Sequence, residues 1–210
     1  MGYEKQLSEN ESLFIIQQMI ETAKQEQKSD GIKGIIWGWL LFLVSLVSFA
    51  NSKMEWFSQY FFWNVFGTLS LAFFLFEIIR NFFFNRVPRV KTYTGDLLER
   101  LNIGFFVSLL FLIIAMNVSI RPTAGFTLLI NLYGFWILVY GAALNFRPSI
   151  IGAFITWGIG LLALFANRFD IVMLLHAAAV LCGYIIPGHI ANREFRKSQL
   201  DSSKNKEYGV

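Results

Sequence analysis

Hydrophobic side chains occur along this chain in six long, nearly uninterrupted runs. A helix needs about 20 apolar residues to cross the roughly 30 Å of hydrocarbon in a bilayer, and strands of globular proteins are usually much shorter. The pattern therefore predicts an all-α polytopic membrane helix bundle with six transmembrane helices. We expect the spans near residues 34–51, 60–79, 101–120, 124–144, 149–166 and 170–190, within a transmembrane domain of residues 32–190.

Basic residues divide the connections between these runs into two classes. Fifteen of the 18 Lys and Arg residues fall before the first run, between the second and third, between the fourth and fifth, or after the sixth. The positive-inside rule therefore predicts that both termini lie in the cytoplasm. The three outer connections are too short to form a domain, so soluble surface is expected only on the cytoplasmic side. It would consist of an arm (residues 1–31), a loop (80–100) and a basic tail (191–210).

The arm itself carries the pattern of an amphipathic helix. Ser8 and Glu11 form a capping box ahead of a periodic apolar run. Ile16, Met19 and Ile20 fall on its apolar side and are candidate contact residues, as are Arg86, Arg89 and Lys91 in the basic loop. The polar side is more acidic than in helices that bind anionic lipid, so we expect the arm to dock in a groove between spans or on a partner. The acidic residues are Glu9, Glu11, Glu21 and Glu26.

Composition agrees with a lipid environment and excludes several kinds of site. Of 210 residues, 55% are hydrophobic and only 15% are charged, against about 25% charged in soluble domains. Cys182 is the only cysteine, so a disulfide within the chain and a cysteine zinc site are excluded. The net charge of +4 comes from bases beside the spans, which favours membrane lipid over nucleic acid as a partner. We expect no cofactor.

His176 is the main candidate for chemistry inside the membrane. It lies six residues after Asp170, roughly 9 Å along a helix, and an ionisable group at that depth is costly unless it has a partner. One interpretation is a proton or ligand site with Asn64, Asn117 or Asn131 as companions. The other is a neutral histidine that bonds to a neighbouring helix.

Small and aromatic residues predict how the spans pack and where they meet the interface. Gly152, Thr156 and Gly160 recur at intervals of four in the fifth span, a face suited to close helix contact within the chain. Trp56, Tyr60 and Trp63, near the start of the second span, predict an aromatic anchor at the outer interface, and Trp37 and Trp39 predict an inner one.

Four short patterns are spread along the chain. They are "LSENESLFIIQQMIETAK", an early "WG" in the first span, "NFRPSIIG" before the fifth and "IPGHI" at the end of the sixth. With these the chain resembles a group of small uncharacterised bacterial six-span membrane proteins. The resemblance implies a multi-pass protein of the bacterial inner membrane and implies no activity.

These patterns favour a non-enzymatic membrane component that acts through its cytoplasmic face, with a cytoplasmic protein as a partner. A small-solute or ion transporter or channel built on His176 and the span asparagines is the alternative. An intramembrane enzyme is the third reading, although the phosphate-binding and hydrolase motifs that would name its residues are missing from the sequence. Homo-oligomerisation is open but nothing in the sequence indicates it.

The predicted topology can be tested with reporter fusions. Alkaline phosphatase fused at Lys53, Arg121 or Arg168 should be active, because these positions lie in the outer connections. A fluorescent protein fused at Val90 or at the C-terminus should fluoresce in the cytoplasm. A C-terminus found outside would overturn the six-span arrangement.

Overall fold

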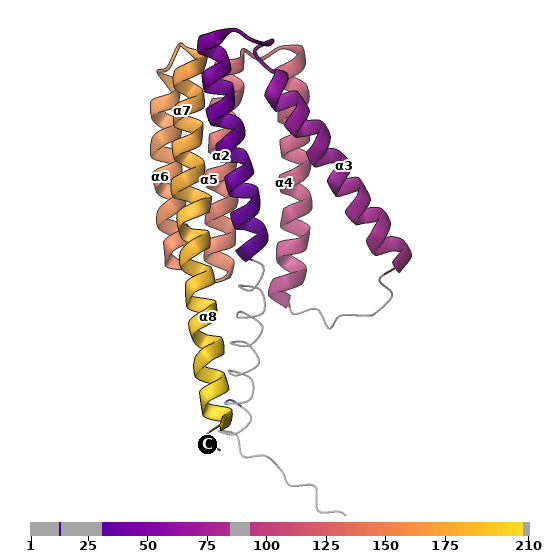
Figure 1. Cartoon of the computed structure of the whole chain (residues 1–210), viewed down its shortest axis with the longest axis vertical. Coiled ribbons are helices and arrows are strands. Elements are labelled where there is room, and N and C mark those ends of the chain that lie inside the picture. The colour runs from indigo at the N-terminus through magenta and orange to yellow at the C-terminus, as the bar shows by residue number, and fades with distance from the viewer. Residues whose placement is uncertain (1–12, 14–30, 85–92, 208–210) are drawn as a thin grey trace, which may run out of the picture.

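The computed structural model describes Leu13 and residues 31–84 and 93–207, and these residues form helices joined by short connections. This confirms the predicted all-α membrane bundle (Figure 1). The helices are α2 (Gly31–Met54), α3 (Phe61–Phe84), α4 (Tyr93–Val118), α5 (Pro122–Ala143), α6 (Arg147–Leu164), α7 (Phe169–Val180), the π-helical turn η1 (Leu181–Ile185) and α8 (Ile186–Glu207).

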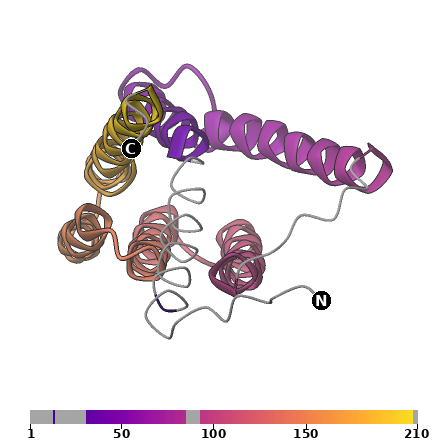
Figure 2. The ribbon, with the colours of Figure 1, turned by 90° about the horizontal axis from the view of Figure 1, so that it is seen from below.

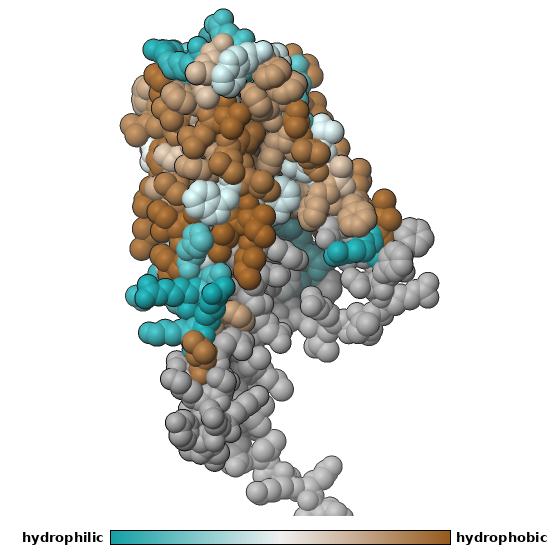
Figure 3. Space-filling model, viewed as in Figure 1, coloured by the Kyte–Doolittle hydropathy of each residue, from teal (hydrophilic) through white to brown (hydrophobic). Residues whose placement is uncertain are grey.

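Five helical stretches are long and apolar enough to cross a membrane. They lie in α2, α4, α5, α6 and the continuous helix from α7 into α8, and α3 adds a shorter apolar stretch, Phe61–Phe76. In the space-filling view, apolar residues cover the middle of the bundle and polar residues gather at its two ends (Figure 3). The chain is therefore a multi-pass membrane protein.

The centre of the bundle is formed by α2, α5, α6 and α7, with α4 against the outer side of α5. In contrast, α3 slants away from the other helices (Figures 1 and 2). Aromatic rings make its contacts: Trp37 of α2 stacks on Phe74 at 5.4 Å between ring centroids, and Phe74 meets Phe106 of α4 at 4.8 Å. These aromatic side chains hold α3 against α2 and α4.

A Schellman-type turn joins α5 to α6. Asn145 has a φ of 50°, in the left-handed region that asparagine tolerates better than most residues. Its N–H donates to the carbonyl of Ala142, and the N–H of Phe146 donates to that of Gly141. Pro148, within the first turn of α6, lacks an N–H that would be unsatisfied there in any case. The turn is tight enough for α5 and α6 to pack along their length.

The last transmembrane helix continues through Pro187. In the region predicted as a basic tail after residue 190, α8 runs on as a helix to Glu207. The π-helical turn η1 ends two residues before the proline, where the ring of a proline in a regular α-helix would clash with the carbonyl four residues earlier. Widening this turn moves that carbonyl away, so the helix axis can continue out of the bundle.

Close contact between α6 and η1 depends on small residues. A methyl group added at Gly183 would lie 2.5 Å from Oγ1 of Thr156 and 2.6 Å from Cδ1 of Ile137. One added at Gly152 would lie 2.9 Å from the carbonyl oxygen of Cys182. The predicted small-residue contact within the chain is confirmed at Gly152 and Thr156.

Replacing Gly183 with alanine should therefore destabilise the bundle. Overpacking of this kind costs about 1 to 3 kcal/mol, which exceeds the gain of about 1 kcal/mol from removing a helical glycine. Gly158→Ala is the matched control, since an added methyl group there meets nothing within 4 Å, and it should leave stability equal or higher. Thermal unfolding in mild detergent measures both. Equal midpoints for the two variants would contradict the close contact at η1.

Candidate functional site

His176 lies at the centre of the bundle and is completely buried. Three aromatic rings surround its imidazole, with centroid distances of 5.2 Å to Trp63, 6.0 Å to Phe126 and 5.5 Å to Tyr133. These rings come from α3 and α5, while His176 itself belongs to α7. The side chain is thus enclosed by apolar surface rather than by water.

A single hydrogen bond joins His176 to the first span. Nδ1 of His176 lies 2.8 Å from Oγ of Ser45, and this hydroxyl donates to the carbonyl of Leu41 at 2.6 Å. A serine hydroxyl has one proton, so the network assigns the N–H to Nδ1, which donates to Ser45. Nε2 then carries a lone pair, and it has no hydrogen-bond partner in the part of the chain that the structure describes.

Ser45 belongs to a polar stripe on α2. Ser45, Ser48 and Asn51 follow at intervals of three, and all three are buried. Oγ of Ser48 has no hydrogen-bond partner among the described residues. Because α2 packs directly on α7, the stripe gives one interface of an otherwise apolar bundle a defined rotation about the helix axis.

The stripe ends in a set of ion pairs where α2 meets α7. Asp170 is buried, and its Oδ2 lies 2.5 Å from Nζ of Lys53 and 2.7 Å from an Nη of Arg168. Asn51 holds the connection between α2 and α3 beside these ion pairs. Its side chain accepts a hydrogen bond from the N–H of Phe57 at 2.9 Å and donates one to the Phe57 carbonyl at 3.1 Å. Ion pairs and hydrogen bonds therefore hold α2 against α7 at this end of the bundle.

A pocket lies at the opposite end of the bundle, where α2 begins. Its volume is about 460 Å³, within the range of small-molecule sites. Apolar side chains such as Leu98 and Ile137 line it together with Glu99, Tyr140 and Tyr184. Tyr184 packs on Tyr133 at 5.7 Å between centroids, and Tyr133 packs on His176, so two aromatic rings separate the pocket from the histidine.

The structure does not bring the predicted asparagines to His176. Asn64, Asn117 and Asn131 are all exposed on the surface of the bundle. Asn117 satisfies its amide within α4, donating to the carbonyl of Ile113 at 2.8 Å. No hydrogen bond joins any of the three to His176 within the ranges described. The partner is Ser45, which sequence reasoning missed, although the spacing of Ser45 and Ser48 on one helix face was a signal.

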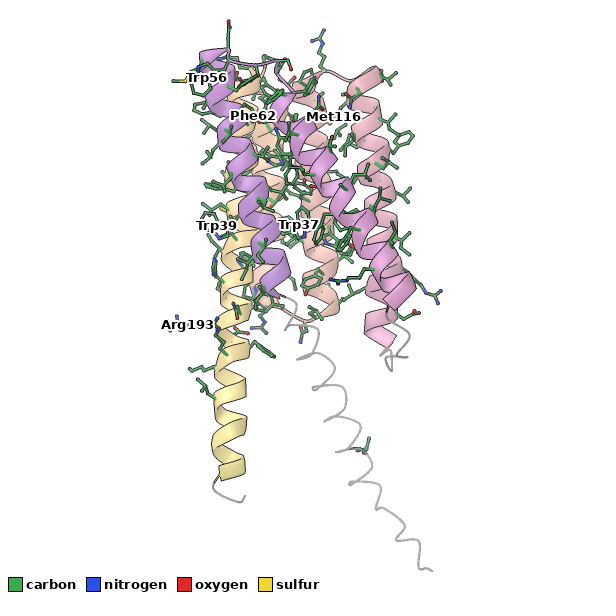
Figure 4. The ribbon with its side chains drawn as sticks, turned by 45° about the vertical axis from the view of Figure 1, so that its right-hand side comes forward. Trp37, Trp39, Trp56, Phe62, Met116 and Arg193 are labelled. Carbon is green, nitrogen blue, oxygen red and sulfur yellow. The ribbon has the colours of Figure 1, made fainter. Side chains whose placement is uncertain are left out.

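Other predicted contacts lie elsewhere. Trp63 faces the core rather than the interface, and its indole N–H lies 3.3 Å from the sulfur of Met173. Trp56 is 62% exposed and lies at the end of the bundle where α2 ends and α3 begins (Figure 4). The candidate cytoplasmic contacts fall outside the described residues; they are Ile16, Met19, Ile20, Arg86, Arg89 and Lys91.

The Ser45–His176 pair resembles a nucleophile with its base, but its geometry does not suit hydrolysis. The hydroxyl proton points to Leu41 instead of the imidazole. The nearest carboxylate along α7, that of Asp170, is bonded to Lys53 and Arg168 instead of orienting the ring, as a third group would in a triad. Within the described ranges, no group of three His, Cys, Asp or Glu residues could hold a metal ion. The pair connects helices.

Neither family models nor curated proteins nor solved structures gave a match to this chain.

Two serines on the same stripe provide a controlled test of the pair. Ser45→Ala leaves Nδ1 of His176 buried without an acceptor, so the free energy of unfolding should fall by about 1 kcal/mol. Ser48→Ala removes a hydroxyl that makes no hydrogen bond to the described residues and should cost less or stabilise the fold. Reversible unfolding in mixed micelles measures both variants. An equal loss in the two would contradict the assigned hydrogen bond.

Proposed function

We propose that this protein is a non-enzymatic membrane component that acts through the end of the bundle where α2 begins and α8 leaves. The supporting observation is the distribution of surface outside the apolar band. At the other end, only short connections occur, at residues 55–60, 119–121 and 165–168. At the end where α2 begins, α8 extends beyond the bundle. It carries three exposed bases there, Arg193, Arg196 and Lys197.

We infer that this end faces the cytoplasm of a bacterial cell. The excess of Lys and Arg in the corresponding connections supports the orientation, and the resemblance to bacterial six-span proteins supports the inner membrane. Figure 4 shows Arg193 pointing outward where α8 leaves the bundle, at the level expected for lipid headgroups. Membrane lipid and a cytoplasmic protein are the partners that suit such a surface, and nucleic acid is not required.

The closed interior favours this role over transport. His176 has no exposed surface, and among the described residues only Ser45 makes a hydrogen bond to it. One observation favours transport as the second candidate: Nε2 of His176 and Oγ of Ser48 are buried without hydrogen-bond partners among the described residues. Such groups mark ion or proton paths in some membrane proteins, so the two candidates need a direct comparison.

The two candidates place the important residues in different parts of the chain. If the cytoplasmic face carries function, replacing Arg86, Arg89 and Lys91 together with glutamine should abolish most of it, because the bases that recognise a partner are lost. His176→Leu should retain function, with a loss of about 1 kcal/mol of stability at most. The measurement is complementation of the phenotype that deletion of the gene produces, at equal amounts of protein in the membrane.

The opposite pattern would reject the proposal. Loss of function in His176→Leu at a normal protein level, with full function in the triple glutamine variant, would establish that function depends on residues inside the bundle. Ser48→Ala serves as the control for a mild change in the same interface.

A further inference from the structure

The pocket at the end of the bundle where α2 begins has a gap in its wall between α2 and α4. At the level of Trp37 and Phe106, the ring of Phe74 of α3 fills the space between these two helices, with centroid distances of 5.4 and 4.8 Å. One turn closer to the helix starts, Gly34 of α2 and Asn102 of α4 line the pocket. There α3 has slanted away (Figures 1 and 2), so none of the described helices covers the gap.

Apolar side chains close the pocket toward the end of the bundle. Leu98 of α4, Leu144 and Phe146 between α5 and α6, and Ala191 of α8 are buried in one cluster there, and all four line the pocket. A guest that enters through the gap between α2 and α4 therefore comes from the bilayer. It meets a mainly apolar cavity of about 460 Å³, which suits an acyl chain and would be costly for a charged solute to enter.

Two polar groups on the pocket wall make no hydrogen bond to the other described residues. They are the amide of Asn102 and the hydroxyl of Tyr184, both on half-buried side chains. The apolar run of α4 begins directly after Arg100, so Asn102 lies where lipid headgroups give way to hydrocarbon. Glycerolipids carry their ester carbonyls at this depth. Such a carbonyl is the acceptor that these two donors lack.

We propose that the pocket binds one acyl chain of a membrane glycerolipid. The chain enters between Gly34 and Asn102, and the Asn102 amide donates a hydrogen bond to its ester carbonyl. Because Gly183 and Pro187 also line the pocket, the bound chain lies against η1 and the start of α8. The site gives the lipid contact of the proposed function a place and rests on it only for which end meets the headgroups. Its test requires no protein partner, so either proposal can fail without the other.

Photolabelling of the full chain in nanodiscs tests whether lipid occupies the pocket. The probe is a phosphatidylethanolamine with a diazirine in one acyl chain, and mass spectrometry locates the labelled residues. Leu144 and Phe146 should be labelled, because they line the pocket and are buried from lipid on the outer surface. No label at either residue, as expected if a protein segment or another ligand fills the pocket, would overturn the proposal.

Two glycine variants separate the pocket from the surrounding lipid. Gly34→Phe places a ring in the cavity, and labelling of Leu144 and Phe146 should fall at least about tenfold. Gly104→Phe is the matched control: a Cβ added at either glycine meets nothing within 4 Å, so both variants should fold, but Gly104 is not among the residues lining the pocket. Its labelling should equal that of the parent. The same labelling in both variants would overturn the proposal.

An asparagine pair tests the polar contact. Asn102→Leu removes the proposed donor, so labelling of Leu144 and Phe146 should fall about fivefold, the net worth of one hydrogen bond. Asn117→Leu is the control on the same helix, since that amide donates to the carbonyl of Ile113 within α4, and it should leave labelling unchanged. Parental labelling in Asn102→Leu would overturn the proposed contact with the ester carbonyl.

Discussion

The contact between the first and last transmembrane helices is the interaction on which the rest of the bundle depends. Most faces of these helices are apolar, and apolar packing in lipid gives little preference for one rotation over another. On α2 and α7 the polar groups remove that freedom. Ser45 must face His176, and Lys53 must reach Asp170. Two polar contacts at different depths therefore fix both the rotation and the height of α2 against α7.

The position of α7 also determines the position of α8 outside the bundle. The helix continues from α7 through η1 into α8 without a break, and its small residues at Gly183 and Gly188 lie against α6 and α2. A rigid helix thus connects the closed polar pair in the membrane to the charged surface beyond it. At the same end of the bundle, the start of α2 lies against α8, where Ile35 meets Gly188.

Much of this architecture could be predicted from the sequence, because length and apolar content decide which segments cross a membrane. The rotation of each span could not. Serine, like threonine, can satisfy its hydroxyl on the preceding turn, as Thr68 does, so the spacing of Ser45 and Ser48 did not by itself distinguish a bond within the helix from one to another helix. Asparagines likewise looked like interior groups, but Asn117 bonds within its own helix and faces outward. Trp63 was assigned to the interface from its position near the start of the second span, whereas its ring fills space beside His176.

The end of the last span shows the same limit. Proline usually interrupts an α-helix, and the widened turn at Leu181–Ile185 explains why the helix continues through Pro187. A π-helical turn depends on tertiary packing, here the close approach of α6 at Gly152, and single-sequence patterns do not report it. The extent of α8 therefore became visible only in the structure.

Solvent access to position 176 tests the central claim, that the bundle is closed and its function lies at the α8 end, most directly. In a Cys182→Ser background, His176→Cys and Arg193→Cys can be compared in nanodiscs with a membrane-impermeant maleimide. The account predicts rapid labelling of the Arg193→Cys variant, since Arg193 is exposed, and no labelling of the His176→Cys variant, since His176 is fully buried. Labelling of both at comparable rates would contradict it, because a water-filled route to the centre of the bundle is what a transporter requires.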